Sequence, residues 1–252
     1  MEKLYYGFKN NIKVEIFRDY DALSKAAAEY IAARVKAKPD IVLGLATGSS
    51  PVGVYDELTR RYEAGELDFS AVRSFNLDEY YPLEPENDQS YRYFMNKNLF
   101  DRVNIDKANT RVPNGVAEDI ERECAEYDAA VASAGGTDIQ LLGIGCNGHI
   151  GFNEPDGSFT AATHKVALTE NTIKANARFF ASEEEVPRFA VTMGMGAIMS
   201  AKSIVLVANG AAKAQAICSM LNGGVDPLCP ASILQLHPDV NVFIDNPAAE
   251  LL

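Results

Sequence analysis

Apolar residues along the chain follow two alternating patterns. Short runs rich in β-branched and aliphatic residues predict strands, and they recur along the whole chain: VEIF, IVLGL, VRSFNL, DIQLLGI, SIVLVAN and VNVFID. Between them lie longer segments in which apolar residues return every three to four positions, such as DALSKAAAEYIAARVKA and EDIERECAEYDAAVASA. This spacing predicts helices, and the alternation predicts a series of strand–helix–strand units.

The predicted strands are apolar on both faces. Residues 41–45 and 139–144 are largely apolar runs, typical of a parallel sheet that is covered on both sides. We therefore predict an α/β fold: a doubly wound, mostly parallel sheet with helices on both faces, which is a Rossmann-like three-layer sandwich. No repeat or low-complexity linker divides the chain, so residues 1–252 are predicted to form a single domain. Ligands of such sheets bind beyond the carboxyl ends of the strands, and functional residues are expected in the loops there.

Composition and charge argue against several classes of function. A net charge of −12 without clustered Lys and Arg argues against nucleic-acid binding, which requires cations to neutralise phosphates. No apolar run reaches the roughly 18 residues of a membrane helix, and the first residues lack the order of a signal peptide, so a cytoplasmic protein without membrane contact is expected. The four cysteines form no CxxC pair, so neither disulfides nor a structural metal is expected.

The loop after the strand predicted at 41–45 has features of an anion site. Residues 46–50 (ATGSS) precede a helix with Pro51 expected at its first position, so backbone N–H groups and hydroxyls would face an anion there. A capped turn without a ligand is the alternative. A helix end stabilises an exposed charge by only about 0.3–1 kcal/mol, so a phosphate also needs cations. Lys213 and Arg178 are the candidates, and each is otherwise a solvated surface charge.

Two adjacent carboxylates close the strand predicted in VRSFNLDEYYPL. Side chains alternate along a strand, so we expect one of Asp78 and Glu79 to face the cleft or the core and the other to face away. In the functional interpretation Asp78 is a general base and Glu79 holds the loop. The alternative is a solvated strand end.

The stretch GIGCNGHIGFNEPDG contains the pattern GxGxxG directly after a predicted buried strand. A dinucleotide site requires the last glycine to open a helix, but Gly151, Pro155 and Gly157 follow within nine residues and predict a turning loop. We therefore exclude dinucleotide binding. The loop also brings together a group suited to proton transfer near neutral pH and polar partners for it: Asn147, His149 and Glu154. A structural hydrogen-bonding histidine is the alternative.

Taken together, these segments resemble the glucosamine-6-phosphate deaminase family of sugar isomerases and lactonases over essentially the full length. The resemblance rests on LATGSSPVGVYDEL, SFNLDEYYPL with NDQSYRYFM, GIGCNGHIGFNEPDGSF, the NARFF segment and VTMGMGAIMSAKSIVLVANGAAKA. It implies conversion of glucosamine 6-phosphate and water to fructose 6-phosphate and ammonia, in amino-sugar catabolism, without an organic cofactor or a metal.

The resemblance also implies a role for each candidate residue. His149 would open the sugar ring with Asn147 and Glu154 as its supports, and Asp78 would move a proton from C2 to C1 of the opened chain. The phosphate would be bound by the loop after the first buried strand and by two cations: Thr47, Gly48, Ser49, Arg178 and Lys213.

The chain departs from the family pattern at two places. Some members carry Asp where this chain has Asn147, and an amide orients the imidazole without a full charge. The allosterically activated hexameric members have basic residues shortly after the NEP motif, whereas this chain has only His164 and Lys165 there. We therefore expect a monomer or a small homo-oligomer that N-acetylglucosamine 6-phosphate does not activate.

Three other functions compete with this prediction. A 6-phosphogluconolactonase-like hydrolase has a similar GxGxxGH loop, but residues 76–80 and 152–155 follow the deaminase pattern. A sugar-phosphate-sensing regulatory domain is the alternative from a different class, and it would not require Asp78, His149 and Glu154 together. A deaminase acting on another amino-sugar phosphate is the third.

Overall fold

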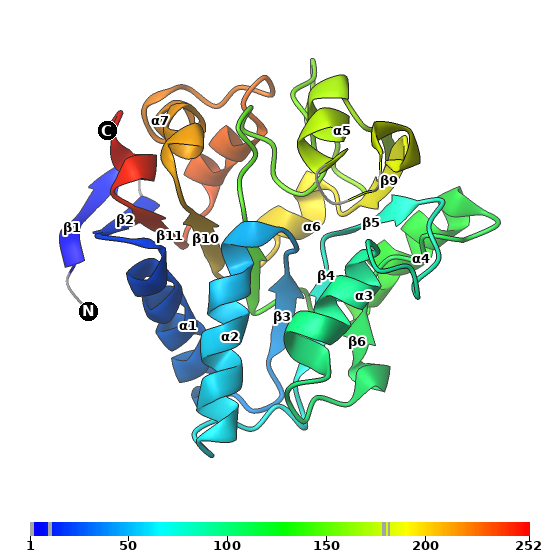
Figure 1. Cartoon of the computed structure of the whole chain (residues 1–252), viewed down its shortest axis with the longest axis horizontal. Coiled ribbons are helices and arrows are strands. Elements are labelled where there is room, and N and C mark those ends of the chain that lie inside the picture. Colours follow the sequence, from blue (N-terminus) through cyan, green and yellow to red (C-terminus); the bar gives the residue numbers. More distant parts are fainter. Residues whose placement is uncertain (1–2, 10–11, 178–179, 181) are drawn as a thin grey trace.

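The computed structural model describes residues 3–9, 12–177, 180 and 182–252. In this part of the chain an eight-stranded sheet forms the centre of the molecule, in the order β1-β2-β11-β10-β7-β3-β4-β6 (Figure 1). Its strands pair in parallel except β1 with β2. Their bounds are β1 (Lys3–Lys9), β2 (Ile12–Phe17), β3 (Val42–Leu45), β4 (Arg73–Asn76), β6 (Thr110–Arg111), β7 (Ile139–Leu142), β10 (Ile204–Ala208) and β11 (Val240–Asp245).

The direction in which the sheet grows reverses between β3 and β7. From β3 the chain adds β4 and then β6 on one side, whereas β7, β10 and β11 follow one another on the other side. Crossovers between parallel strands are right-handed, so the helices of the two halves must cover opposite faces. The loops after β3 and β7 therefore diverge at a topological switch point, where open α/β sheets bind their ligands.

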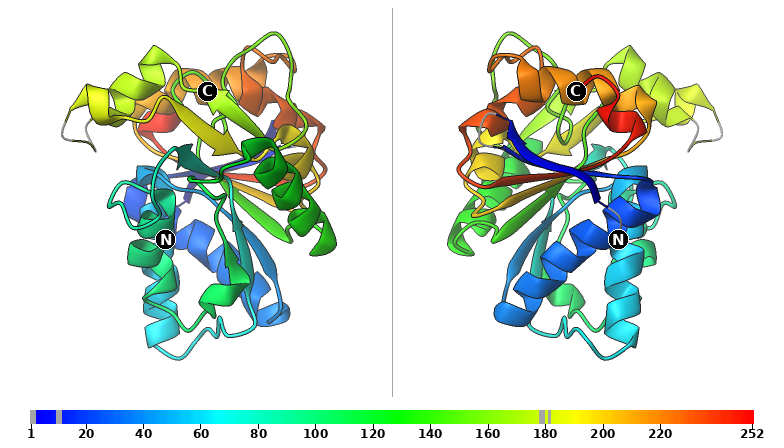
Figure 2. Two further views of the ribbon diagram at one scale, coloured as in Figure 1. Left: turned by 90° about the vertical axis from the view of Figure 1, so that its right-hand side faces the viewer. Right: turned by 90° about the vertical axis from the view of Figure 1, so that its left-hand side faces the viewer.

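Helices cover both faces of the main sheet, as the sequence predicted. Figure 2 shows α1 and α2 on one side and α4 on the other. The α-helices are α1 (Tyr20–Ala37), α2 (Ser49–Glu63), α3 (Tyr91–Met95), α4 (Ile120–Ser133), α5 (Glu170–Asn176), α6 (Met195–Met199) and α7 (Ala214–Asn222). Shorter helical turns span Asn96–Phe100, Lys107–Asn109, Glu183–Glu185, Ala211–Lys213, Pro230–Leu236 and Pro247–Ala249. Helix α1 illustrates the local causes: Asp19 caps its first turn by accepting from the Ala22 N–H, and one face buries apolar residues.

A second, three-stranded antiparallel sheet stands beside the main one. It consists of β5 (Asp78–Tyr81), β9 (Phe189–Thr192) and β8 (His164–Ala167), in that order. Leu77 joins the two sheets, because its N–H donates to Leu45 in β3 and its carbonyl accepts from Met193 just after β9. The prediction that Asp78 and Glu79 close the strand before them is therefore wrong. That strand, β4, ends at Asn76, and the two carboxylates open a strand of the other sheet.

The core lies on both faces of the main sheet. The strands at its centre are fully buried along their whole length, as the continuous apolar runs predicted. Each buried aliphatic side chain contributes about 1.5–3 kcal/mol relative to an exposed one, so this centre is the most strongly determined part of the fold. Among the described residues, no helix combines the length and apolar character needed to cross a membrane.

Candidate active site

Three loops meet beyond the carboxyl ends of β3, β7 and β10, which are neighbours in the main sheet. The start of α2, which follows the loop after β3, touches the loop after β10: Ser50 Oγ donates to Asn209 Oδ1 at 2.8 Å. The loop after β7 lies between them in the strand order. The structure therefore brings the segment around Thr47 and the segment leading to Lys213 to one edge of the sheet, as predicted.

The loop after β3 leaves the first turn of α2 without a side-chain cap. Gly48 stands at the N-cap with φ of +97°, a left-handed conformation that favours glycine, and within the described chain no side chain caps the helix there. The Tyr20 hydroxyl receives the Gly53 N–H at 2.7 Å, whereas Ser49 and Ser50 lie at the positive end of the helix dipole. Pro51 is the third residue of α2 and not the first, because the helix begins at Ser49.

Of the two predicted cations, the structure describes only Lys213. Lys213 ends the short helical turn after β10, and the preceding Gly210 N–H is held by both oxygens of Asp245 at 2.9 and 3.1 Å. This contact fixes the start of the loop that carries Lys213. Arg178 lies outside the described residues.

Asp78 and Glu79 are both buried, at 5% and 1% exposure, so neither faces solvent and the solvated strand end is excluded. Asp78 Oδ1 has no hydrogen-bond partner among the described residues. Burial, followed by the neighbouring Glu79 carboxylate, raises the pKa of Asp78 well above its usual value. A buried carboxylate with an unpaired oxygen is a stronger base than a solvated one.

Glu79 binds the start of α3. Its two oxygens accept the backbone N–H groups of Tyr80, Tyr91 and Arg92 at 2.8–2.9 Å. Burial raises the pKa of Glu79 to about 7, although these amides and the Arg92 charge act in the opposite direction. The prediction that Glu79 holds the local structure is confirmed. The segment that Glu79 holds is the first turn of α3, which begins twelve residues later.

The segment 143–157 contains no helix, which confirms that its GxGxxG pattern is not a dinucleotide fingerprint. Its turn closes on itself: the Gly145 N–H donates to the His149 carbonyl at 2.9 Å. The imidazole of His149 lies against Gly145, where an added β-carbon would stand 2.4 Å from the ring. Glycine at 145 is therefore required by the position of the imidazole.

The three predicted residues of this loop form one hydrogen-bonded group. His149 Nδ1 lies 3.4 Å from Glu154 Oε2, an ion-pair contact without hydrogen-bond geometry, and Nδ1 has no hydrogen-bond partner among the described residues. The same oxygen of Glu154 accepts Asn147 Nδ2 at 2.7 Å. Asn147 Oδ1 in turn accepts the backbone N–H of His149 at 3.3 Å. A carboxylate beside Nδ1 favours the tautomer with its proton there and leaves Nε2 free as a base.

Glu154 is ionised in this arrangement. Burial opposes its charge, but the His149 imidazole and the donors Thr172 and Asn147 outweigh it and lower the pKa of Glu154 to about 2. Its side chain is only 7% exposed. Near neutral pH this loop therefore holds a fixed negative charge behind the imidazole.

The loop after β7 lies against the carboxylate of β5. Two residues after His149, Gly151 is placed so that an added β-carbon would stand 3.5 Å from Asp78 Oδ2 and 2.9 Å from Thr192 Oγ1. The Thr192 hydroxyl oxygen accepts the Phe152 N–H at 3.0 Å, and Thr192 pairs with Asp78 across β9 and β5. The two predicted proton-transferring groups are thus brought to neighbouring segments of one site.

Sequence reasoning missed two threonines of this site, Thr172 and Thr192. Thr172 donates to Glu154 Oε1 from α5, and Thr192 joins the loop to β9. Both side chains are buried. A single threonine in a helix or a strand carries no signal until its spatial neighbours are known.

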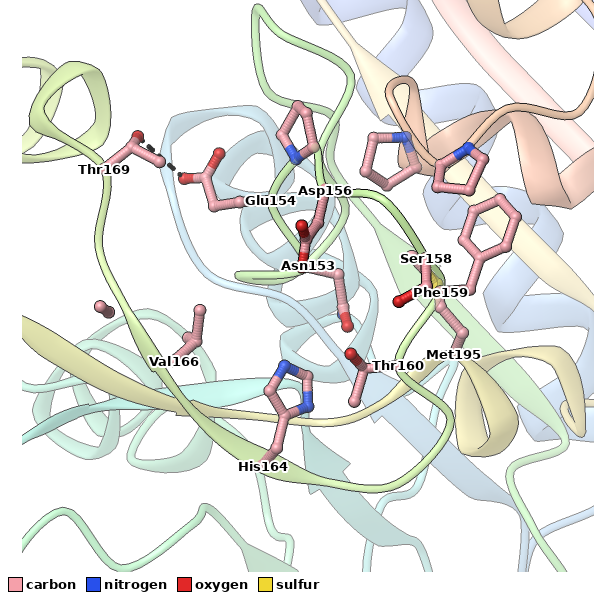
Figure 3. A pocket seen from close by; sticks show the side chains of 14 residues that line it. Asn153, Glu154, Asp156, Ser158, Phe159, Thr160, His164, Val166, Thr169 and Met195 are labelled. Atoms are coloured by element: carbon pink, nitrogen blue, oxygen red, sulfur yellow. Dashed lines mark hydrogen bonds between the residues drawn. The ribbon is translucent and has the colours of Figure 1, made fainter.

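A cavity of about 230 Å³ is lined by Glu154 and by other residues of the loop after β7 and of β8. Figure 3 shows Glu154 at one side of it, bonded to Thr169, with His164 among the other lining residues. No Lys or Arg is among the described residues that line it. Lys165 points elsewhere, with Nζ 4.2 Å from the centre of the Phe189 ring.

The described residues contain no cluster of three or more His, Cys, Asp or Glu suited to a metal ion. The carboxylates of the site are already engaged with backbone amides or with the imidazole, apart from Asp78. The chemistry that this site offers is proton transfer between a supported imidazole and a buried carboxylate, beside an uncapped helix end.

Comparisons with known proteins find relatives over nearly the whole chain. A glucosamine-6-phosphate deaminase of Clostridioides difficile (strain 630) is 55% identical over 241 residues, which are 96% of this chain and 97% of that protein. One of Thermoanaerobacter pseudethanolicus is also 55% identical, over 96% of this chain and 95% of that protein.

Solved structures give the same result. A structure described as a monomeric glucosamine-6-phosphate deaminase has a TM-score of 0.93 and 46% identity, covering 95% of this chain and 99% of that one. The 6-phosphogluconolactonase from Leishmania guyanensis shares the fold, with a TM-score of 0.73 at 22% identity over 94% of this chain and 97% of that one. The family described as glucosamine-6-phosphate isomerases/6-phosphogluconolactonase matches residues 18–242, and the chain belongs to it.

Proposed function

We propose that this protein converts glucosamine 6-phosphate and water to fructose 6-phosphate and ammonia. The observation that carries the proposal is the pairing of a Glu154-supported His149 with a buried Asp78 across Gly151. Relatives with this activity in their names align over nearly the whole chain. An aldose–ketose isomerisation requires two proton-handling groups near adjacent carbons, and the site contains two.

The phosphate is bound at the edge where the loops after β3 and β10 meet. Backbone N–H groups and hydroxyls of Thr47, Gly48 and Ser49 face it at the start of α2, with Lys213 and Arg178 as cations. The uncapped helix end and the contact between the start of α2 and the loop after β10 support this assignment. Because the chain carries a net charge of −12, local cations must supply the attraction that the overall field does not.

Ring opening is the task of His149. Its Nε2 removes the proton of the C1 hydroxyl and delivers a proton to the ring oxygen O5, so the C1–O5 bond breaks and C1 becomes a carbonyl. Glu154 stabilises the imidazolium that forms. Asn147 holds Glu154 and His149 together by hydrogen bonds to the carboxylate of one and the backbone N–H of the other. An amide at 147 adds no charge, so Glu154 supplies all of the electrostatic support that reaches the ring from this loop.

Proton transfer on the open chain is the task of Asp78. It removes the C2 proton, which the new carbonyl has made acidic, and an enol-type intermediate forms; the same proton is then returned to C1. The resulting iminium at C2 adds water and releases ammonia, leaving a ketose. Burial raises the pKa of Asp78, and this makes the carboxylate a better base than a solvated aspartate.

Two other functions fit the site less well. Hydrolysis of a 6-phosphogluconolactone needs one base for water and no proton transfer at C2, so a buried Asp78 with an unpaired oxygen would have no task. A sugar-phosphate sensor would need neither proton-transferring group.

The decisive experiment measures both products. Purified protein is incubated with glucosamine 6-phosphate in the presence of a chelator, and ammonium and ketose phosphate are quantified together. We expect equal amounts of both, unaffected by the chelator, because no step requires a metal or an organic cofactor. A protein that hydrolyses a 6-phosphogluconolactone and releases no ammonium would contradict the proposal.

We further propose that the protein acts as a monomer or small homo-oligomer, in a single domain, within the cytoplasm. The similar solved structure is described as monomeric. All four cysteines are unpaired, as expected where thiols stay reduced. The cavity beside Glu154 offers an anionic sugar no Lys or Arg among its described lining residues, which supports the absence of activation by N-acetylglucosamine 6-phosphate.

A further inference from the structure

The carboxylate of Glu154 is divided between two sets of donors. Oε2 faces His149 Nδ1 and accepts Asn147 Nδ2, both from the loop after β7. Oε1 faces away from the imidazole and accepts the hydroxyl of Thr172, with the Thr169 hydroxyl 3.4 Å away (Figure 3 draws the Thr169 contact). The second oxygen is therefore held by α5, an element outside the loop.

Helix α5 is itself fixed at several points, so the position of its hydroxyl is well determined. Thr169 caps the helix by accepting the Thr172 N–H, and its hydroxyl lies 3.1 Å from the Thr172 hydroxyl. Ile173 packs in the small cluster that contains Tyr80 and Phe152. At the other end, Asn176 Nδ2 donates to the Tyr80 hydroxyl at 2.8 Å.

We infer that Thr172 is a positioning residue for ring opening: its hydroxyl fixes the rotation of the Glu154 carboxylate so that Oε2 stays directed at His149 Nδ1. The inference rests on the function proposed above. Asn147 and His149 share Oε2, so without Thr172 the carboxylate can turn about its last bond, out of the orientation in which one oxygen faces the imidazole. The contact behind the imidazole would then be longer or misdirected, and Nε2 would lose its fixed direction.

Burial of the Thr172 hydroxyl means that its hydrogen bond to Glu154 is not easily replaced. Thr172 is 6% exposed, so water cannot easily replace its hydroxyl next to Glu154. Substituting valine keeps the branched shape and removes only the donor, which leaves Oε1 with the weak Thr169 contact. A hydrogen bond to a charged group is worth enough that its loss slows the supported step by about tenfold or more.

Ring opening can be measured separately from the later proton transfer. In an Asp78→Asn background the C2 proton is not moved, so opening and reclosing appear only as exchange between the two anomers of glucosamine 6-phosphate. Two-dimensional exchange NMR spectroscopy gives this rate, with the rate in buffer subtracted. We expect Thr172→Val to lower the enzyme-catalysed exchange at least about tenfold, and Thr172→Ser to restore it to within about threefold of the parent.

A control variant and a replacement variant separate the loss of the Thr172 hydroxyl from a general loss of stability. Lys174→Ala alters an exposed residue of the same helix and should leave the exchange rate unchanged. If Thr172→Val melts below the assay temperature, Thr172→Ala takes its place, and Thr172→Ser must again recover the rate. Equal exchange in the valine, serine and parent proteins would overturn the inference, as would a parent that catalyses no exchange at all. Failure of the proposed function is a separate outcome, because the wild-type protein would then release no ammonium.

Discussion

Gly151 faces the carboxylate of Asp78: a β-carbon added to it would make van der Waals contact with Asp78 Oδ2 at 3.5 Å and would be crowded by the Thr192 hydroxyl oxygen at 2.9 Å. His149 is only two residues earlier in the same turn. The loop after β7 of the main sheet, which carries the imidazole, is therefore held next to β5 of the three-stranded sheet, which carries Asp78.

Asp78→Asn should reduce ammonia release at least about 10²-fold, because an amide cannot accept the C2 proton. The variant should also be more stable than the wild type near neutral pH. The folded-state pKa of Asp78 is raised above its usual 3.8, so ionising this group costs stability as the pH rises above that value. Thermal unfolding at pH 7 and pH 3.5 checks the sign: the gain should be present at the higher pH and largely absent at the lower. Near wild-type turnover would remove Asp78 from the mechanism.

Glu154→Gln should lower turnover by about tenfold or more, since the amide cannot stabilise an imidazolium as a carboxylate does. Its effect on stability has the opposite pH dependence to that of Asp78. The folded-state pKa of Glu154 is lowered from 4.5 to about 2, so its contribution is complete above pH 4.5 and disappears as the pH falls toward 2. Urea unfolding of both proteins between pH 7 and pH 2.5 should show the difference between them shrinking. A constant difference across that range would contradict the assignment.

Gly145→Ala should lower turnover about 10²-fold by displacing the imidazole, because the new methyl group would stand 2.4 Å from the ring of His149. Gly157→Ala is the matched control in the same loop, since nothing lies within 4 Å of its added β-carbon. Steady-state kinetics of both variants, with melting temperatures, provide the measurement. Equal activities in the two variants would mean that the imidazole position is not critical.

Lys213→Met should raise KM for the sugar phosphate by about tenfold while kcat changes less, because the cation binds a group that does not react. Inorganic phosphate should also inhibit this variant more weakly. Lys202→Met is the control: Lys202 pairs with Asp138 at 2.7 Å before the start of β10, at the opposite edge of the sheet. A fall in kcat with unchanged KM would place Lys213 outside the phosphate site.

N-acetylglucosamine 6-phosphate should not activate the protein, and the dependence of rate on substrate concentration should be hyperbolic. The reason is electrostatic: the described lining of the cavity beside Glu154, which includes His164, has no Lys or Arg, and Lys165 lies over the rings of Tyr81 and Phe189. Initial rates with and without the compound, together with sedimentation analysis, test this. A sigmoidal curve that the compound makes hyperbolic would refute it.

The sequence was sufficient to predict six of the eight strands of the main sheet, because its central strands are continuous apolar runs, whereas β1 and the two-residue β6 at the sheet's edges were not predicted. It also predicted which loops carry the chemistry, since parallel strands deliver their following loops to one edge. The turn at Leu77 could not be predicted: no Gly or Pro separates β4 from β5, so SFNLDEYY has the pattern of one strand. Burial of both Asp78 and Glu79 follows from that change of sheet.

The contacts of the candidate site were predictable only where they are local. Asn147, His149 and Glu154 lie within eight positions, so a turning loop is enough to bring them together. Thr172 reaches Glu154 across 18 positions, and Thr192 reaches Phe152 across 40. Such pairs depend on how α5 and β9 pack, and no local pattern of residues encodes that packing.

Leu77 links the two sheets by hydrogen bonds directly beside the candidate site. A single residue carries hydrogen bonds to both sheets, one to Leu45 and one from Met193, directly before Asp78. These hydrogen bonds hold the loop that follows Leu45 at a fixed distance from the carboxylate of Asp78. Local opening at the outer strands of either sheet should therefore leave that distance unchanged. Amide protons at Leu77 and Met193 should accordingly be among the slowest in the protein to exchange with deuterated solvent.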